Sequence, residues 1–218
     1  MTAASVALNA LELDAVTELV NLGVSRAAVS LGKLVGAEVL LSVPSVEIVS
    51  RDAAARALGQ RDDGRLVAVH QLFDGQISGR ALLIFSETNS LELVRAMTGD
   101  ALPMEDILGL EQDALAETGN IILNGCLAVM ANMLRRTLVI SLPEILYGSS
   151  ADIFRLSTAQ AADVSVMFLC INFSVRYWNI QGHIALLMDV PSFSALRTLL
   201  DQLIARESDG RGDNDVFS

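Results

Sequence analysis

The sequence predicts an α/β fold of the α+β kind, in which long helices and a mainly antiparallel sheet form the two layers of a single domain. Three observations predict it. A polar motif occurs twice, 99 residues apart, and the same order of helix, strand, short helix, hairpin and helix accompanies each copy. Asp74-Gly75 lies between two strand-like runs, which is a strong hairpin signal. No linker rich in glycine, serine or proline separates the halves, so we expect an internal pseudo-twofold duplication with a shared sheet.

The repeated motif has the pattern D-x3-E-x2-N, followed after 22 residues by P. Its residues are Asp14, Glu18, Asn21 and Pro44 in the first copy and Asp113, Glu117, Asn120 and Pro143 in the second. Chance is a poor explanation, since proline is only about 5% of residues and recurs here at the same distance. Because the matched positions are polar, the repeat indicates a shared chemical role as well as a shared core.

The first half is predicted from hydrophobic periodicity and from residues that end helices and strands. Apolar residues recur at helical spacing from Leu13 to Leu31, and Gly36 is placed to end this helix as its C-cap. Pro44 restricts the next strand to an edge or a bulge, because proline cannot donate to a sheet ladder. The expected elements are a helix at 10–34, a strand at 38–50, a short helix at 51–58, hairpin strands at 66–73 and 77–85, and a helix at 90–97.

The second half repeats this order. Its expected elements are a long helix at 110–134, a strand at 138–145 that carries Pro143, a short helix at 151–156, strands at 164–173 and 180–188, and a closing helix at 192–205. The domain is expected to span 1–206, with internal repeats at about 8–98 and 107–205. Residues 207–218 are rich in glycine and acidic side chains, which predicts a disordered tail.

Composition excludes several classes of function. The formal net charge of −11 argues against nucleic acid as a partner, because phosphates require clusters of Lys and Arg. The sequence contains no run of 18 uncharged apolar residues, so we expect no membrane span. The N-terminus lacks the basic region of a signal peptide. Cys126 and Cys170 lie in apolar runs and are expected to be buried thiols, which favours a cytoplasmic location. His70 and His183 have no further ligands at suitable spacing, so we expect structural roles and no bound metal.

Three interpretations of the motif compete. Offsets of four and seven residues place Asp14, Glu18 and Asn21 on one helix face, which could be a solvated acidic face, a metal site or a catalytic site. Two copies in register argue against a merely solvated face. A metal site would need ligands that converge from other elements. The third interpretation uses the amide, which has no accessible pKa and can hold a water in line with a phosphorus atom. Since the sequence contains no nucleotide-binding motif, the phosphoryl group would arrive on a partner.

The two motif copies resemble the signature of the CheC/CheX/FliY family of response-regulator phosphatases, and they are most similar to CheC, whose members carry two such sites in one duplicated domain. The resemblance extends over about residues 8–205. It implies hydrolysis of the aspartyl phosphate on a phosphorylated CheY-like receiver domain, in chemotaxis or related two-component signalling. It also implies that Mg²⁺ belongs to the receiver and that this chain binds no cofactor of its own.

The resemblance assigns a role to each motif residue. Asn21 and Asn120 would position the attacking water, and Glu18 and Glu117 would pair with the lysine of the receiver's active site. Asp14 and Asp113 match the first motif position, and Pro44 and Pro143 would shape the adjoining strand. A CheD-like deamidase is a further partner that the resemblance implies, although we find no residue pattern for it. The alternative function is a non-catalytic adaptor that binds receivers, or a component of the flagellar-switch type.

We expect both copies to be active but unequal. Arg26 follows the first motif and would favour the approach of a receiver, whose active site is a cluster of carboxylates. Asp106 and Glu111 precede the second motif and would oppose that approach. Exposed charges are individually weak and are screened by salt, so the expected difference in affinity is modest.

Overall fold

The computed structural model describes residues 8–61, 64–98, 103–156, 164–175 and 178–212. The elements in chain order are α1 (Ala10–Val35), β1 (Val39–Ser50), α2 (Arg51–Arg61), β2 (Leu66–Gly75), β3 (Gly79–Ser86), α3 (Glu87–Thr98), α4 (Met104–Met133), β4 (Leu138–Ile140), β5 (Glu144–Gly148), α5 (Ser150–Leu156), β6 (Val164–Val175), β7 (Trp178–Asp189) and α6 (Val190–Gly212). Every strand pair is antiparallel. The predicted mixed α/β class with an antiparallel sheet is confirmed.

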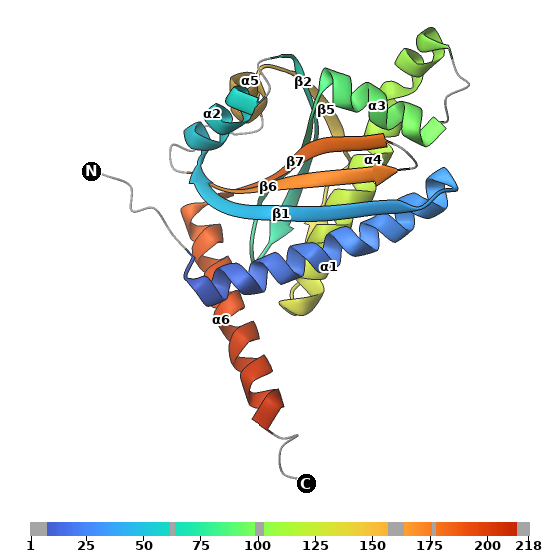
Figure 1. Ribbon diagram of the computed structural model, residues 1–218. Helices are drawn as coiled ribbons and strands as arrows, with labels where there is room; N and C mark the ends of the chain where they lie inside the picture. Colours follow the sequence, from blue (N-terminus) through green and yellow to red (C-terminus); the bar gives the residue numbers. More distant parts are fainter. Residues whose placement is uncertain (1–7, 62–63, 99–102, 157–163, 176–177, 213–218) are drawn as a thin grey trace.

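The sheet joins strands from both halves of the chain. Its order is β1-β6-β7-β3-β2-β4, and β5 also pairs with β2. The strand that follows α1 therefore adds to the hairpin of the second half, while the strands that follow α4 add to the hairpin of the first half. Figure 1 shows β1, β6 and β7 side by side. This exchange accounts for the shared sheet, whereas the internal duplication itself stays a prediction.

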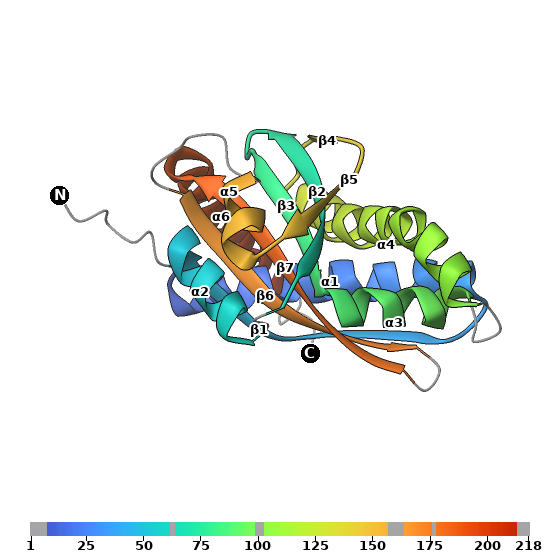
Figure 2. The ribbon, with the colours of Figure 1, turned by 90° about the horizontal axis from the view of Figure 1, so that it is seen from above.

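The core lies mainly on one face of the sheet. Side chains alternate across β2, so that Val67 and Val69 join the larger core with α1, α3, α4 and α6, while Leu66 and Ala68 join a smaller core with α2 and α5. α2 and α5 lie close together in both views, and Figure 1 shows them apart from α1, α3 and α4 (Figures 1 and 2). The two expected layers thus form most of the molecule, and the two short helices form a partial third layer.

The ends of the two motif helices differ. Before α1, Asn9 and Glu12 form a capping box, in which each side chain accepts the other's backbone N–H. Before α4, Pro103 offers no side-chain cap, and the helix begins earlier than predicted. Both helices are followed by a residue in the left-handed region, Gly36 at φ 64° and Arg135 at φ 55°. The predicted C-cap at Gly36 is confirmed, and the corresponding position of the second half holds a residue with a Cβ.

The turn of the first hairpin differs from the prediction. Asp74 and Gly75 belong to β2 and pair with β4, so the turn that leads to β3 lies at residues 76–78. A Cβ at Gly75 would lie 2.5 Å from the carbonyl oxygen of Thr137, so glycine is needed here for the approach of another strand. The predicted hairpin is confirmed, but the prediction that Asp74-Gly75 forms its turn is wrong.

The strand expected at 138–145 is divided. β4 and β5 flank residues 141–143, where Ser141 donates its N–H to the carbonyl of Leu72 at 2.9 Å. The Ser141 hydroxyl accepts the N–H of Leu72 at 2.9 Å, so a side-chain oxygen takes the place of a backbone carbonyl as the acceptor between the strands. Pro143 cannot supply a rung of its own, because it has no N–H. The prediction of one continuous strand is therefore wrong.

The first proline is accommodated differently. β1 is continuous and lies at one end of the sheet order. Its pairing with β6 shifts register between Ser42 and Ser45, and Pro44 lies inside this irregularity. A bulge on an edge strand is where a sheet tolerates proline, as the sequence predicted.

The last helix is longer than expected. α6 continues to Gly212, beyond residue 205, where the closing helix was expected to end, and 213–218 lie outside the described residues. The disordered tail at 207–218 stays a prediction. Arg206 donates to the carbonyl of Met133 at 3.2 Å and so ties this part of α6 to the end of α4. Figure 1 shows the C-terminal end of α6 projecting from the body of the molecule.

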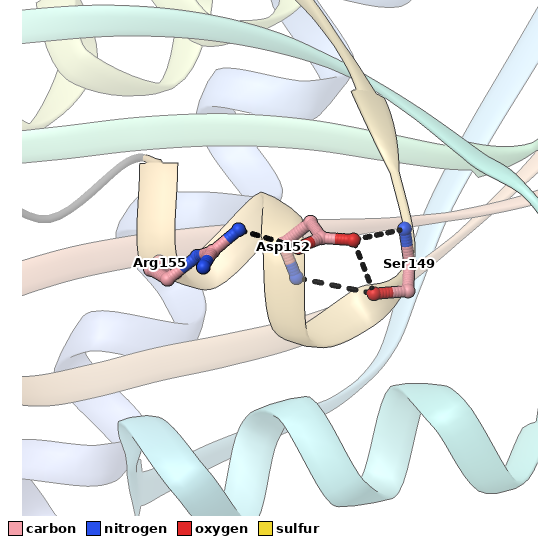
Figure 3. A network of polar contacts seen from close by, with 3 residues as sticks. All are labelled: Ser149, Asp152 and Arg155. Carbon is pink, nitrogen blue, oxygen red and sulfur yellow. Dashed lines mark hydrogen bonds and ion pairs between the residues drawn. The ribbon is translucent and has the colours of Figure 1, made fainter.

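The short helix α5 begins with a polar network (Figure 3). The Ser149 hydroxyl accepts the N–H of Asp152 at 3.2 Å and donates to its carboxylate at 2.7 Å. Arg155 donates to the other carboxylate oxygen at 2.8 Å. The bonds from Ser149, followed by the charge of Arg155, lower the pKa of Asp152 from its ordinary value. This N-terminal cap stabilises α5, which has only seven residues.

In the described part of the chain, one helix is long and apolar enough to cross a membrane. It is the part of α4 from Gly109 to Met133, and 56% of its most apolar window is buried inside the fold. Core helices of globular proteins meet the same length and composition test, and α4 packs on the sheet and on α1.

Candidate functional site

The motif residues form a polar ridge on each of two helices. Asp14 and Glu18 are exposed on α1, and Asn21 is half-buried beside them. The same pattern of exposure holds on α4 for Asp113, Glu117 and Asn120. In each ridge the glutamate and the asparagine are three residues apart and therefore neighbours on the helix surface. The catalytic role of these residues stays a prediction.

The two ridges lie on helices whose backbones touch. A Cβ at Gly23 of α1 would lie 2.6 Å from the Cα atom of Cys126 on α4, and a Cβ at Gly125 would lie 3.1 Å from the carbonyl oxygen of Gly23. Glycine at both positions permits this close approach, which larger residues would prevent. Gly23 follows Asn21 by two residues, so the helix contact fixes the position of the first ridge relative to the second helix.

A buried glutamate anchors the N-terminal part of each motif helix. Glu12 is only 1% exposed and accepts from Arg197 of α6 at 3.1 Å. Glu111 is 9% exposed and accepts from Ser90 of α3 at 2.7 Å. The two glutamates are 99 residues apart, like the motif residues, and this spacing is the signal by which sequence reasoning could have found them.

The carboxamide of Asn120 is held by two other amides. Its Oδ1 accepts from Nδ2 of Asn124, one helical turn further along α4, at 2.7 Å. It also accepts from Nε2 of Gln71 on β2 at 3.3 Å. The same Nε2 donates to the carbonyl of Ser141 at 3.0 Å. Sequence reasoning missed Gln71, because a strand residue 49 positions away gives no local signal of its contact with α4.

Asn21 lacks this support. In the part of the chain that the structure describes, its side chain makes no hydrogen bond. The residues 99 positions from Asn124, Gln71 and Ser141 are Ser25, Cys170 and Ser42, so neither supporting amide has a counterpart at the first site. The two ridges therefore share their motif but differ in the residues around it.

The charges expected to distinguish the two sites are placed differently from the prediction. Arg26 is exposed, but it is five residues from Asn21, which turns it by about 140° away from that side chain. Glu111 is buried against Ser90 instead of facing the solvent beside the second ridge. The side chain of Asp106 lies outside the described residues. Arg26 and Glu111 therefore do not lie where the expected charge difference needs them, and the prediction that both copies are active but unequal stays a prediction.

The histidines and cysteines lie within or beside the sheet. His70 is buried with Nδ1 3.6 Å from a carboxylate oxygen of Glu144, and burial, followed by the charge of Arg80, lowers its pKa. His183 is also buried, and its ring stacks on that of Phe168. Within the described residues, no group of three or more His, Cys, Asp or Glu side chains could hold a metal ion.

Burial of the two thiols is unequal. Cys126 is buried on α4, and this burial raises its pKa to about 12. Cys170 on β6 is only half-buried, so the prediction of two buried thiols is correct for Cys126 alone.

Two curated proteins are similar in sequence. A protein of Halobacterium salinarum that bears the name CheY-P phosphatase CheC1 is 28% identical over 145 residues, which cover 65% of this chain and 71% of that protein. The CheY-P phosphatase CheC of Bacillus subtilis is 23% identical over 197 residues, which cover 85% of this chain and 91% of that protein. No family model matches the chain.

Solved structures show the same fold. FliY of Thermotoga maritima superposes with a TM-score of 0.71 at 17% identity, over 90% of this chain and 98% of that chain. A chain of the FliM–SpeE complex of H. pylori superposes with a TM-score of 0.63 at 12% identity, over 90% and 97%. At these identities the likeness concerns the fold alone. Together with the similarity to the two CheC sequences, it confirms the predicted resemblance of the chain to CheC/CheX/FliY-like proteins.

Proposed function

We propose that this chain is a phosphatase that hydrolyses the aspartyl phosphate of a CheY-like response regulator, in the cytoplasm, in chemotaxis or related two-component signalling. The observation that carries the proposal is the pair of surface ridges, each with an exposed carboxylate three residues before a half-buried carboxamide. The names of the two curated relatives support the same substrate class.

The reaction needs a positioned water. Water attacks the phosphorus atom, the bond from phosphorus to the aspartate oxygen breaks, and the products are inorganic phosphate and a free carboxylate. Asn21 and Asn120 act on the water and on the phosphoryl oxygens through hydrogen bonds, because a carboxamide has no accessible pKa and cannot be a general base. A water-positioning side chain of this kind acts in phosphoryl transfer by other proteins.

The glutamates provide the contact with the partner. Within the described residues, Glu18 and Glu117 form no ion pair, so their carboxylates are available to a cation on another protein. The lysine of a receiver active site supplies such a cation. An exposed pair contributes little in water, but docking excludes water and strengthens the attraction. Mg²⁺ is held by the receiver, and a CheD-like deamidase remains an expected second partner.

The first test is phosphate release from a purified CheY-like receiver that is phosphorylated in the presence of Mg²⁺. We expect the chain to accelerate release, and Asn21→Ala combined with Asn120→Ala to remove on the order of a hundredfold of that acceleration. Asn89→Ala is the control, since Asn89 is a half-buried helical asparagine on α3, outside both ridges. Circular dichroism should show that all variants are folded at the assay temperature, with a melting temperature lower by only a few degrees for the double variant, which loses the two bonds at Asn120.

The alternative function gives a different result in the same experiment. A non-catalytic adaptor would bind the phosphorylated receiver, measured by calorimetry with a stable phosphoryl analogue, and would leave the rate of phosphate release unchanged. If the double asparagine variant released phosphate as fast as the unmodified chain, the ridges would be surface features without a catalytic role.

A further inference from the structure

The carboxamide of Asn120 is oriented by its neighbours. Its Oδ1 accepts from both Asn124 and Gln71, which occupies the two lone pairs of that oxygen. Its Nδ2 donates to no group among the described residues. The atom left for a ligand is therefore a donor, and its direction is set by two hydrogen bonds on the opposite side of the amide.

The orientation of the Asn120 amide follows from the backbone carbonyl of Ser141, which can only accept a hydrogen bond. The carbonyl of Ser141 only accepts, so the Gln71 atom that faces it at 3.0 Å must be Nε2. Because this same Nε2 faces Asn120 at 3.3 Å, the facing atom of Asn120 must be an acceptor, Oδ1. Reversing the Asn120 amide would require Gln71 to turn its oxygen toward the Ser141 carbonyl, and two acceptors would then oppose each other.

The bond from Gln71 to the Ser141 carbonyl stabilises the fold, but it does not explain the whole side chain. Its side chain is fully buried, and its Oε1 has no hydrogen-bond partner in the described structure. A buried carbonyl without a partner is unfavourable, whereas an apolar side chain of the same shape would avoid this cost. The Oδ1 atom of Asn124 is likewise buried without a partner in this part of the structure. Both residues keep an unfavourable group and both direct their donors at Asn120.

We infer that Gln71 and Asn124 are positioning residues for the second site, which hold the Nδ2 atom of Asn120 toward the phosphoryl group and its attacking water. This inference rests on the proposed phosphatase function. A donor at this position stabilises the charge that develops on the phosphoryl oxygens, and a side chain that is already oriented needs no reorganisation during the reaction. Asn21, with Ser25 and Cys170 at the corresponding positions, lacks this preorganisation. The second site is the faster of the two.

The test measures each site separately. On an Asn21→Ala background, only the second site turns over, and Gln71→Met removes the donor while it keeps a side chain of similar length. We expect kcat to fall about tenfold, the effect of one net hydrogen bond, with KM for the phosphorylated receiver unchanged, because Gln71 is buried and does not touch the partner. Asn124→Ser, which introduces the residue found at the corresponding position of the first site, should lower kcat in the same way and serves as the second variant if Gln71→Met does not fold.

Two further results decide between positioning and general packing. On an Asn120→Ala background, Gln71→Met should add no further loss, since the group that it positions is gone. Equal losses on both backgrounds, an unchanged kcat for both variants on the Asn21→Ala background, or a rise in KM alone would overturn the inference. Failure of the proposed function would look different, because the unmodified chain itself would then not accelerate phosphate release.

Discussion

The two motif helices carry the same ridge but are stabilised at different places. α1 is secured at its ends, by the capping box with Asn9 and by Gly36 in the left-handed region. α4 has no side-chain cap at its start, and Arg135 follows it in the left-handed region. The asparagines show the opposite difference. Asn120 on α4 has two amide partners, whereas Asn21 on α1 has none among the described residues. A repeated motif therefore does not imply two equal sites, because the residues that orient each amide lie outside the motif.

The largest stability difference is expected between the two anchoring glutamates. Glu12→Ala removes the capping-box acceptor and the bond from Arg197, which should lower the free energy of unfolding by about 2 kcal/mol. Glu111→Ala should cost about 1 kcal/mol, because Ser90 keeps a second acceptor in the carbonyl of Glu87. Urea unfolding of both variants measures this. Equal losses would show that the capping box and the contact with Arg197 stabilise α1 no more than the bond from Ser90 stabilises α4.

The next effect separates the two amides in activity. Asn120→Ala alone should lower phosphate release about tenfold, corresponding to about 1.4 kcal/mol of barrier, and Asn21→Ala alone less than about twofold. The physical reason is that Asn120 is oriented before the receiver docks. Initial rates at saturating phosphorylated receiver give the comparison. A larger loss for Asn21→Ala would reverse the order of the two sites.

The third effect compares the residues that follow the two helices. Arg135→Gly should raise the free energy of unfolding by about 1 kcal/mol, because a residue with a Cβ is strained at φ 55°. Gly36→Ala should lower it by about the same amount, since Gly36 has φ 64° and no atom within 4 Å of an added Cβ, so that only the backbone conformation opposes the change. Thermal unfolding of both variants checks the pair, and a loss of stability in Arg135→Gly would contradict the interpretation.

The smallest effect concerns the two short helices. Ser149→Ala removes a hydroxyl that bonds to Asp152 in both directions, and we expect the melting temperature to fall by no more than about 2–4 °C at neutral pH. Ser50→Ala should have a smaller effect, since among the described residues Ser50 makes a single side-chain bond, in which it accepts the N–H of Ala53 at 3.2 Å.

The effect of Ser149→Ala on the melting temperature should depend on pH. The pKa of Asp152 is lowered from 3.8 in the folded protein, so its contribution to stability is present above pH 3.8 and is lost as the pH falls through the folded pKa. The melting temperatures of Ser149→Ala and the unmodified chain should therefore differ at neutral pH and converge in acid. A difference that is constant down to pH 3 would exclude the carboxylate as its source.

Much of the local structure could be predicted from the sequence. The periodicity from Leu13 to Leu31 predicted α1, Gly36 marked its end, and the motif spacing predicted which residues share a helix face. These features depend on residues that are close in sequence, whose effects on helix geometry are known in advance. Errors occurred where a distant strand decided the outcome, as at Asp74 and Gly75, which pair with β4 instead of forming the turn.

The sequence by itself determined the class of the fold, the two polar ridges and the chemistry that a carboxylate and an amide can perform there. Only the tertiary structure decided that the strands after α1 and α4 exchange between the halves, that Glu12 and Glu111 are buried, and that Gln71 reaches Asn120. The physical reason is that helix faces follow from a fixed rise and turn per residue, whereas the partner of a buried polar group depends on which distant segments pack together.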